Sequence, residues 1–368
     1  MSPIASAIWY NVGMTDKIQA GPSAVRGRAV LLMAALLSAA VSSVPAARAQ
    51  SAGGGFNGAA RYATDAYPGF DLEESALSPS RKAPRWFGFL FGPDCDSASA
   101  QFAHCQGLVA NGDLDKAVRQ LDALVRGWPT APEAWKAQRQ CADLLFERLG
   151  RYEDAFAEYR YLLDFYSLQC DYAAIADRLY QVAGAMRREG KEILFVRFAN
   201  TVDVRRAYET CVLRAPGAKW APEAMLTIAS LREDEGKLDE AVKVYENLRS
   251  LHPDADEAKT AVAREASVRM AILREREYNR LRARDTVDFM TLALEACRPS
   301  DAEAIKACRA EAEALIAEEA YRGAKFYDSR MRTRRSAINA YEKFLEAHPE
   351  SAHAPGVRAR LEELKGAE

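Results

Sequence analysis

Histidine is scarce in this chain, and its cysteines never recur at a short spacing. The 368 residues include four histidines, which is too few for a histidine-rich metal site. The seven cysteines form no C-x-x-C pair, so neither a zinc motif nor a redox motif is supported. We therefore expect no metal-binding residues, and the odd number of cysteines leaves at least one thiol free.

The common catalytic motifs are also missing. The sequence has no G-x-S-x-G, no Walker loop, no dinucleotide-binding glycine motif and no H-E-x-x-H. The formal net charge of −2 gives no basic domain of the kind that binds nucleic acid. We predict that the chain is not an enzyme, with no catalytic residues, no cofactor-binding residues, no cofactor and no nucleic-acid partner.

The first 49 residues are interpreted as a signal peptide region. Two arginines precede an apolar run over residues 29–44, and Ala47–Ala49 forms an A-x-A cleavage site, which predicts cleavage before Gln50. The run is shorter than the roughly 20 residues of a spanning helix, although an uncleaved anchor is the alternative. The first cysteine is Cys95, so no lipid-anchor site follows the run. The pattern predicts a periplasmic protein.

Residues 50–93 are predicted to be a low-complexity linker that ends in an aromatic segment. Glycine, alanine, serine and proline dominate residues 50–84, which favours a flexible chain. The aromatic segment is RWFGFLFGP, residues 85–93. It either packs on the first folded unit or anchors the chain to a membrane surface or a partner.

Residues 216–255 contain the clearest structural pattern, two amphipathic helices joined by a tight turn. Pro222 suits a first helical turn, and Gly236 suits a helix end because glycine tolerates positive φ. In the second helix, Ala241 is small where two helices cross, and Tyr245 fills the space toward the next helix. These residues recur at the offsets of a tetratricopeptide repeat (TPR), in which each hairpin needs neighbours to bury both of its faces.

Similar hairpins recur along residues 94–365. The fold class predicted is all-α, a TPR-type α-α superhelix (a solenoid of antiparallel helix hairpins) with a disordered N-terminal region. Residues 256–296 contain no glycine or proline and are predicted to form one long helical tract. The arginines of that tract either form a solvated face or a docking surface for an acidic partner. The repeat units are predicted near residues 98–131, 136–169, 172–214, 222–255 and 317–351, with a capping helix at 355–364.

A stack of such hairpins has a groove lined by the first helix of each unit, where an extended or helical peptide can lie. Charge reversal at Arg148 and Glu233 is expected to weaken peptide binding without unfolding the protein. The groove-facing residues predicted are Phe102, Gln106, Gln140, Glu147, Arg148, Leu226, Ser230 and Glu233.

Two segments carry a resemblance to a known family. These are WAPEAMLTIASLREDEGKLDEAVKVYENLRSLHPD, residues 220–254, and YRGAKFYDSRMRTRRSAINAYEKFLEAHPES, residues 321–351. Over roughly residues 98–364 the chain resembles the outer-membrane assembly factor BamD (YfiO) family. The resemblance implies a periplasmic scaffold for β-barrel assembly, peripheral to the outer membrane, with the BamA-type barrel subunit and unfolded outer-membrane proteins as partners. The lipidated cysteine of that family is absent here.

Two other functions remain open from the sequence. The chain could be a periplasmic TPR adaptor for cell-envelope or peptidoglycan machinery. It could also be an enzyme carried on a TPR scaffold, although no residues outside the repeats form a catalytic group.

Overall fold

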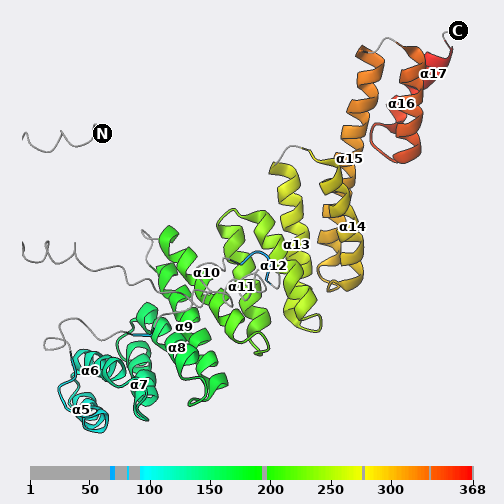
Figure 1. Cartoon of the computed structure of the whole chain (residues 1–368). Helices are drawn as coiled ribbons and strands as arrows, with labels where there is room; N and C mark the ends of the chain where they lie inside the picture. Colours follow the sequence, from blue (N-terminus) through cyan, green and yellow to red (C-terminus); the bar gives the residue numbers. More distant parts are fainter. Residues whose placement is uncertain are drawn as a thin grey trace, which may run out of the picture. The chain divides into compact units, whose positions relative to one another are not determined.

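The computed structural model describes residues 67–70, 81–82, 92–192, 197–275, 278–330 and 333–366. These residues form helices and no strands (Figure 1), so the all-α prediction is confirmed for the described part of the chain. The predicted signal peptide at residues 1–49 and residues 85–91 of the aromatic segment lie outside the described residues. The helices are α5 Ala98–Ala110, α6 Leu114–Gly127, α7 Ala134–Glu147, α8 Tyr152–Phe165, α9 Tyr172–Glu192, α10 Arg197–Arg214, α11 Ala221–Asp234, α12 Leu238–Leu251, α13 Asp256–Glu275, α14 Arg280–Ala296, α15 Ala302–Arg330, α16 Arg334–Ala347 and α17 Ala354–Gly366.

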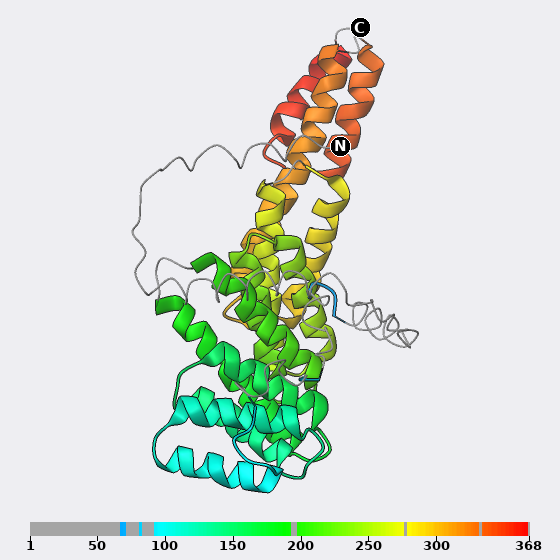
Figure 2. The ribbon, with the colours of Figure 1, turned by 60° about the vertical axis from the view of Figure 1, so that its left-hand side comes forward.

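Successive helices pack on one another as antiparallel hairpins (Figure 1, Figure 2). We call α5, α7, α9 and α11 the first helices and α6, α8, α10 and α12 the second helices. Three of the hairpins turn through a glycine with positive φ, Gly112 at 83°, Gly150 at 64° and Gly236 at 73°. The next residue then donates its N–H back to the carbonyl oxygen of Leu108, Leu145 or Arg232, at 3.0 Å, 2.9 Å and 2.9 Å. This closure satisfies the helix end and favours glycine, because other residues are strained at that φ.

The first helix of the third hairpin does not end at its glycine. α9 continues through Gly190 to Glu192. Glycine inside a helix lowers stability without preventing the helix when the neighbouring turns are well packed, as they are before it in α9. The second helix, α10, begins at Arg197.

The tract predicted to be one long helix is two helices, α13 and α14, which pack on each other. Tyr278 and Asn279 are not helical, and the Asn279 side chain accepts hydrogen bonds from the N–H groups of Leu281 and Arg282. Asparagine is a strong N-cap, so a new helix can begin here without glycine or proline. The single-helix prediction was therefore wrong.

The helices bury apolar side chains in three clusters. The first runs from α5 to α13, the second joins α13, α14 and the first half of α15, and the third joins the second half of α15 to α16 and α17. α13 contributes Val268 to the first cluster and Met270 to the second, while α15 contributes Ile305 to the second and Ala324 to the third. These two helices therefore connect separate cores.

Two parts of the predicted flexible linker are bound to the repeats. Tyr67 and Phe70 stack with their ring centroids 5.2 Å apart and pack against the first cluster. The Gly69 carbonyl accepts a hydrogen bond of 2.7 Å from Arg232 of α11. Further along, Lys82 is held by side chains of α6, α7 and α8. A linker without fixed contacts was therefore the wrong description at both points, because single aromatic and charged side chains supply the binding.

Candidate functional site

Side-chain contacts run from each first helix to the next. Gln106 of α5 and Gln140 of α7 face each other, with amide nitrogen-to-oxygen distances of 2.7 Å and 3.2 Å. Glu147 of α7 forms an ion pair of 2.9 Å with Arg178 of α9. We call this surface the first-helix face. Its polar contacts lie at the surface, so they align the helices more than they stabilise them.

The first-helix face continues from α9 to α11 through an aromatic contact. The Trp220 indole N–H donates to Asp177 at 2.7 Å, and its ring stacks on Tyr180 at 4.6 Å with an interplanar angle of 5°. Trp220 directly precedes α11, so the contact fixes how that helix begins beside α9.

A cavity of about 610 Å³ opens between α7, α9, α10 and α11. Arg187 reaches into its wall and donates to the Thr227 hydroxyl at 3.2 Å, while Arg188 is exposed. Burial, reinforced by Glu223, raises the pKa of Tyr180, so this phenol stays protonated at neutral pH. The cavity thus offers arginine donors beside aromatic rings. Its lining residues are Phe146, Tyr180, Gln181, Gly184, Arg187, Arg188, Tyr208 and Glu223.

The structure brings some of the predicted groove residues together and separates others. Gln106 meets Gln140, as described above, whereas Glu147 pairs with a residue that was not predicted. Arg148 is exposed at the end of α7. Phe102, Leu226 and Ser230 are half-buried, and the first two pack against the first cluster. The groove assignment as a whole stays a prediction.

Glu233 has a structural role that the sequence did not reveal. Its carboxylate accepts a hydrogen bond from the hydroxyl of Tyr245, whose ring is fully buried, and lies 3.8 Å from Arg264 of α13. Charge reversal at Glu233 would remove the acceptor of a buried hydroxyl. It is therefore expected to destabilise the fold, unlike reversal at Arg148.

The sequence analysis did not predict the residues that line the cavity between α7, α9, α10 and α11. Tyr180, Arg187 and Tyr208 lie on the interrupted third hairpin, where the repeat pattern was weakest. Trp220 is the first residue of the segment 220–254 quoted above, and no contact was predicted for it. The signal in the sequence was a tryptophan at the start of α11 together with Tyr180 on the first helix of the preceding hairpin, because two such rings can stack.

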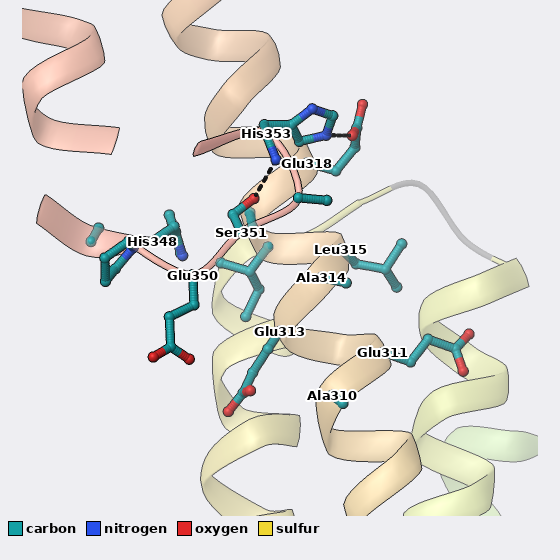
Figure 3. A pocket seen from close by; sticks show the side chains of 15 residues that line it. Ala310, Glu311, Glu313, Ala314, Leu315, Glu318, His348, Glu350, Ser351 and His353 are labelled. Carbon is teal, nitrogen blue, oxygen red and sulfur yellow. Dashed lines mark hydrogen bonds and ion pairs between the residues drawn. The ribbon is translucent and has the colours of Figure 1, made fainter. Parts of the chain in front are cut away.

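A second cavity, of about 870 Å³, lies between α15 and the turn joining α16 to α17 (Figure 3). His353 Nε2 lies 2.5 Å from a Glu318 oxygen, and the His353 ring stacks on Tyr321 at 4.1 Å. Ser351 also lines the cavity, but its hydroxyl accepts from the backbone N–H of His353 at 3.3 Å, not from the ring. The serine, histidine and glutamate therefore do not have the geometry of a nucleophile relay.

Within the described ranges, no group of three or more histidine, cysteine or acidic residues is placed to hold a metal ion. The seven cysteines are free thiols. Burial, with a smaller contribution from Cys95, raises the pKa of Cys105 to about 11, and burial also raises the pKa of Cys141 and Cys211. These three thiols are poor nucleophiles at neutral pH.

None of the helices in the part of the chain that the structure describes combines the length and the hydropathy required to span a bilayer.

Comparison with known proteins identifies the repeats. Two family models, each described as tetratricopeptide repeat, match residues 102–169 and 223–255. No curated protein matches the chain. Solved structures that resemble it include a tetratricopeptide repeat protein from Parabacteroides merdae ATCC 43184, with 14% identity, a TM-score of 0.27, and coverage of 73% of this chain and 98% of that one. Another is MamA 41-end from Desulfovibrio magneticus RS-1, with 14% identity, a TM-score of 0.26, and coverage of 55% and 96%.

The two matched segments cover α5 to α8 and α11 to α12 almost completely. Together with the all-helical hairpins, they show a TPR-type protein, and TPR repeats indicate a scaffold for protein–protein interaction.

Proposed function

We propose that this TPR-type protein is a non-enzymatic scaffold that binds other polypeptides along its first-helix face. The observation that carries the proposal is the cavity between α7, α9, α10 and α11. Its arginines and aromatic rings suit one side chain of an extended peptide, either aromatic or acidic. The side-chain contacts between successive first helices give such a peptide a continuous surface on either side of that cavity.

The cellular role we propose is assembly and insertion of β-barrel proteins into the outer membrane. Two observations support it: the leader pattern before Gln50, and the resemblance of residues 220–254 and 321–351 to the BamD family. In this role the protein is periplasmic and peripheral to the outer membrane. Its partners are a BamA-type barrel subunit and unfolded outer-membrane proteins.

Site-specific crosslinking in cells tests this proposal. A photoreactive residue replaces Gln181, an exposed residue that lines the cavity. Arg188→Glu in the same protein should reduce the crosslinked product several-fold, because it reverses a charge at the cavity. Arg335→Glu is the matched control, since Arg335 is equally exposed but lies on α16.

The identity of the crosslinked protein separates the proposed roles. A barrel-assembly subunit or an outer-membrane protein supports the proposal. Cell-wall enzymes would instead identify an adaptor for peptidoglycan machinery. Crosslinking that is unaffected by Arg188→Glu would show that the cavity is not the binding site, and a product found only in the cytosol would contradict the location.

A further inference from the structure

Residues 81–82 fill a second binding site, on α6, α7 and α8, of which only α7 also lines the cavity described above. The Lys82 ammonium lies 2.8 Å from Asp122 of α6, 2.5 Å from Glu158 of α8, and 3.4 Å from the side-chain oxygen of Gln138 of α7. It also lies 5.1 Å from the ring centroid of Tyr161. We call Asp122, Gln138, Glu158, Tyr161 and Phe165 the lysine socket.

The repeats themselves hold the socket in shape. Arg126 donates to the second carboxylate oxygen of Asp122 at 2.7 Å. The Gln138 amide donates to the backbone carbonyl of Glu158 at 2.9 Å and to its carboxylate, and Gln138 is fully buried. These contacts do not involve Lys82, so the socket residues are expected to keep their places when Lys82 leaves.

The electrostatics of the socket favour a cation. Burial alone would lower the pKa of Lys82, but the carboxylates of Glu158 and Asp122 outweigh it and raise that pKa. Burial likewise tends to raise the pKa of Asp122, and Lys82 together with Arg126 outweighs it and lowers that pKa. Without Lys82, the two mostly shielded carboxylates of Asp122 and Glu158 would have only Arg126, which contacts Asp122, beside them, and an under-compensated buried charge is costly. An empty socket should therefore take up another basic side chain.

The contacts of residues 81–82 can be reproduced by a different peptide. The Lys82 backbone N–H donates to the Tyr161 hydroxyl at 3.3 Å, and the Arg81 guanidinium lies 5.2 Å from the ring centroid of Phe165. A main-chain N–H, a guanidinium and an ammonium are groups that any extended peptide with an Arg-Lys pair carries.

We propose that the lysine socket is a recognition site for an extended basic peptide of a partner protein, and that Arg81 and Lys82 occupy it until that peptide displaces them. The covalent connection of residues 81–82 to the repeats determines how tightly a partner peptide must bind to displace them. Residues 81–82 are joined to α5, which begins at Ala98, by a short segment of the same chain. Their effective concentration at the socket is therefore on the order of millimolar. Only a partner that makes further contacts, or is locally concentrated, displaces them. The site does not depend on the function proposed for the first-helix face.

Fluorescence anisotropy tests the proposal with a labelled peptide of residues 78–85, SPSRKAPR. The full chain with Arg81→Ala and Lys82→Ala should bind this peptide at least tenfold more tightly than the wild-type chain, because its socket is empty. Adding Asp122→Asn and Glu158→Gln should then weaken binding at least tenfold. A peptide with glutamine in place of its lysine should also bind at least tenfold more weakly.

The matched control adds Glu153→Gln and Asp154→Asn to the variant with the empty socket. These changes neutralise two exposed carboxylates of α8, the helix that carries Glu158, and should leave binding unchanged. No binding by the folded variant with the empty socket would overturn the proposal, as would equal binding after the socket carboxylates are neutralised. If the double variant does not fold alone, refolding with excess peptide replaces the binding assay. Failure of the peptide to restore the fold would then also count against the socket.

Discussion

At the scale of single residues, the same tyrosine–carboxylate contact recurs in three hairpins. Each contact joins a tyrosine of the later helix to an acidic residue of the earlier helix. In each case burial, and then the hydrogen bond to the carboxylate, raises the pKa of the tyrosine; that of Tyr341 rises to about 12. The three pairs are Tyr159 with Asp143, Tyr245 with Glu233, and Tyr341 with Asp328.

These tyrosines should make the fold sensitive to alkali. A tyrosine whose pKa is raised on folding contributes stability that is complete below pH 10, its unfolded pKa, and is lost as pH rises toward the folded value. The free energy of unfolding should fall above pH 10 by about 1.4 kcal/mol per pH unit for each such tyrosine. Urea unfolding between pH 8 and pH 11.5 measures this slope. Tyr159→Phe should make the slope shallower, and a slope unchanged from wild type would contradict a raised pKa of Tyr159. Tyr327→Phe, at an exposed position on α15, is the control and should leave the slope unchanged.

A buried ionic network links α10 to α11. Glu209, which is fully buried, lies 2.6 Å from Arg205 and 3.4 Å from Arg232, and Arg205 also contacts Glu235 at 2.8 Å. Glu209→Gln removes the charge while keeping the side-chain shape, which leaves two buried arginines with one fewer counter-charge. We expect a loss of about 3–5 kcal/mol in the free energy of unfolding.

Urea denaturation of Glu209→Gln measures that loss. Asp234→Asn is the matched control because Asp234 is exposed at the end of α11, and surface changes typically stay within about 0.5 kcal/mol. If the two variants were equally stable, water would have to reach the network far more than its burial indicates.

The residue scale also shows what the sequence could and could not predict. The aromatic offset of the repeat predicted Tyr245 as a packing residue, and the structure buries it fully. Its carboxylate partner was not predictable, because the pairs are separated by 16, 12 and 13 residues in the three hairpins. A contact without a constant spacing leaves no periodic signal in the sequence.

At the scale of helices, glycine has opposite effects in two places. Gly323 lies inside α15, and a Cβ added there meets no atom within 4 Å, so Gly323→Ala should raise the free energy of unfolding by about 0.5–1 kcal/mol. Gly236 closes a turn with a φ of 73°, so Gly236→Ala should lower it by about 1 kcal/mol or more. Thermal and urea unfolding of both variants measures the signs. Equal effects would mean that backbone conformation does not decide the outcome.

Glycine and proline predicted helix boundaries unevenly. Gly236 gave the correct turn, whereas Gly190 lies inside α9. The turn between α13 and α14 depends on Asn279, and asparagine also occurs inside helices, as Asn339 does in α16. A cap is recognised by which N–H groups its side chain reaches, and that follows from the path of the chain.

At the scale of the whole chain, the repeat fold followed from the sequence, but the binding of residues 67–70 and 81–82 did not. The packing of repeated helices can be predicted from the sequence because each unit has apolar residues at the same positions. The N-terminal contacts depend on single side chains, such as Lys82 between Asp122 and Glu158, in a segment whose composition is that of a linker. Composition predicts the average behaviour of a segment, whereas one lysine in a complementary socket is enough to bind it.

The separate cores of the described residues predict unequal local stability. The third cluster contains four buried residues, Ala324, Tyr341, Phe344 and Val357, whereas the first extends over eight helices and part of α13. Stability in a repeat array is a sum over neighbouring contacts, so the smaller core should open at lower free energy. Amides of α16 should therefore exchange with deuterium faster than those of α8.

Phe344→Ala separates the two cores experimentally. Phe344 is 3% exposed, and its truncation typically removes about 3–5 kcal/mol, which should exceed the stability of the third cluster. Hydrogen exchange in α16 and α17 should then rise to the rate of an unfolded chain, while exchange in α7 and α8 stays as in wild type. Phe326→Ala, at a side chain that is 53% exposed on α15, should change neither. Faster exchange in α7 and α8 of the Phe344→Ala variant would instead show that α13 and α15 couple the three cores into one cooperative unit.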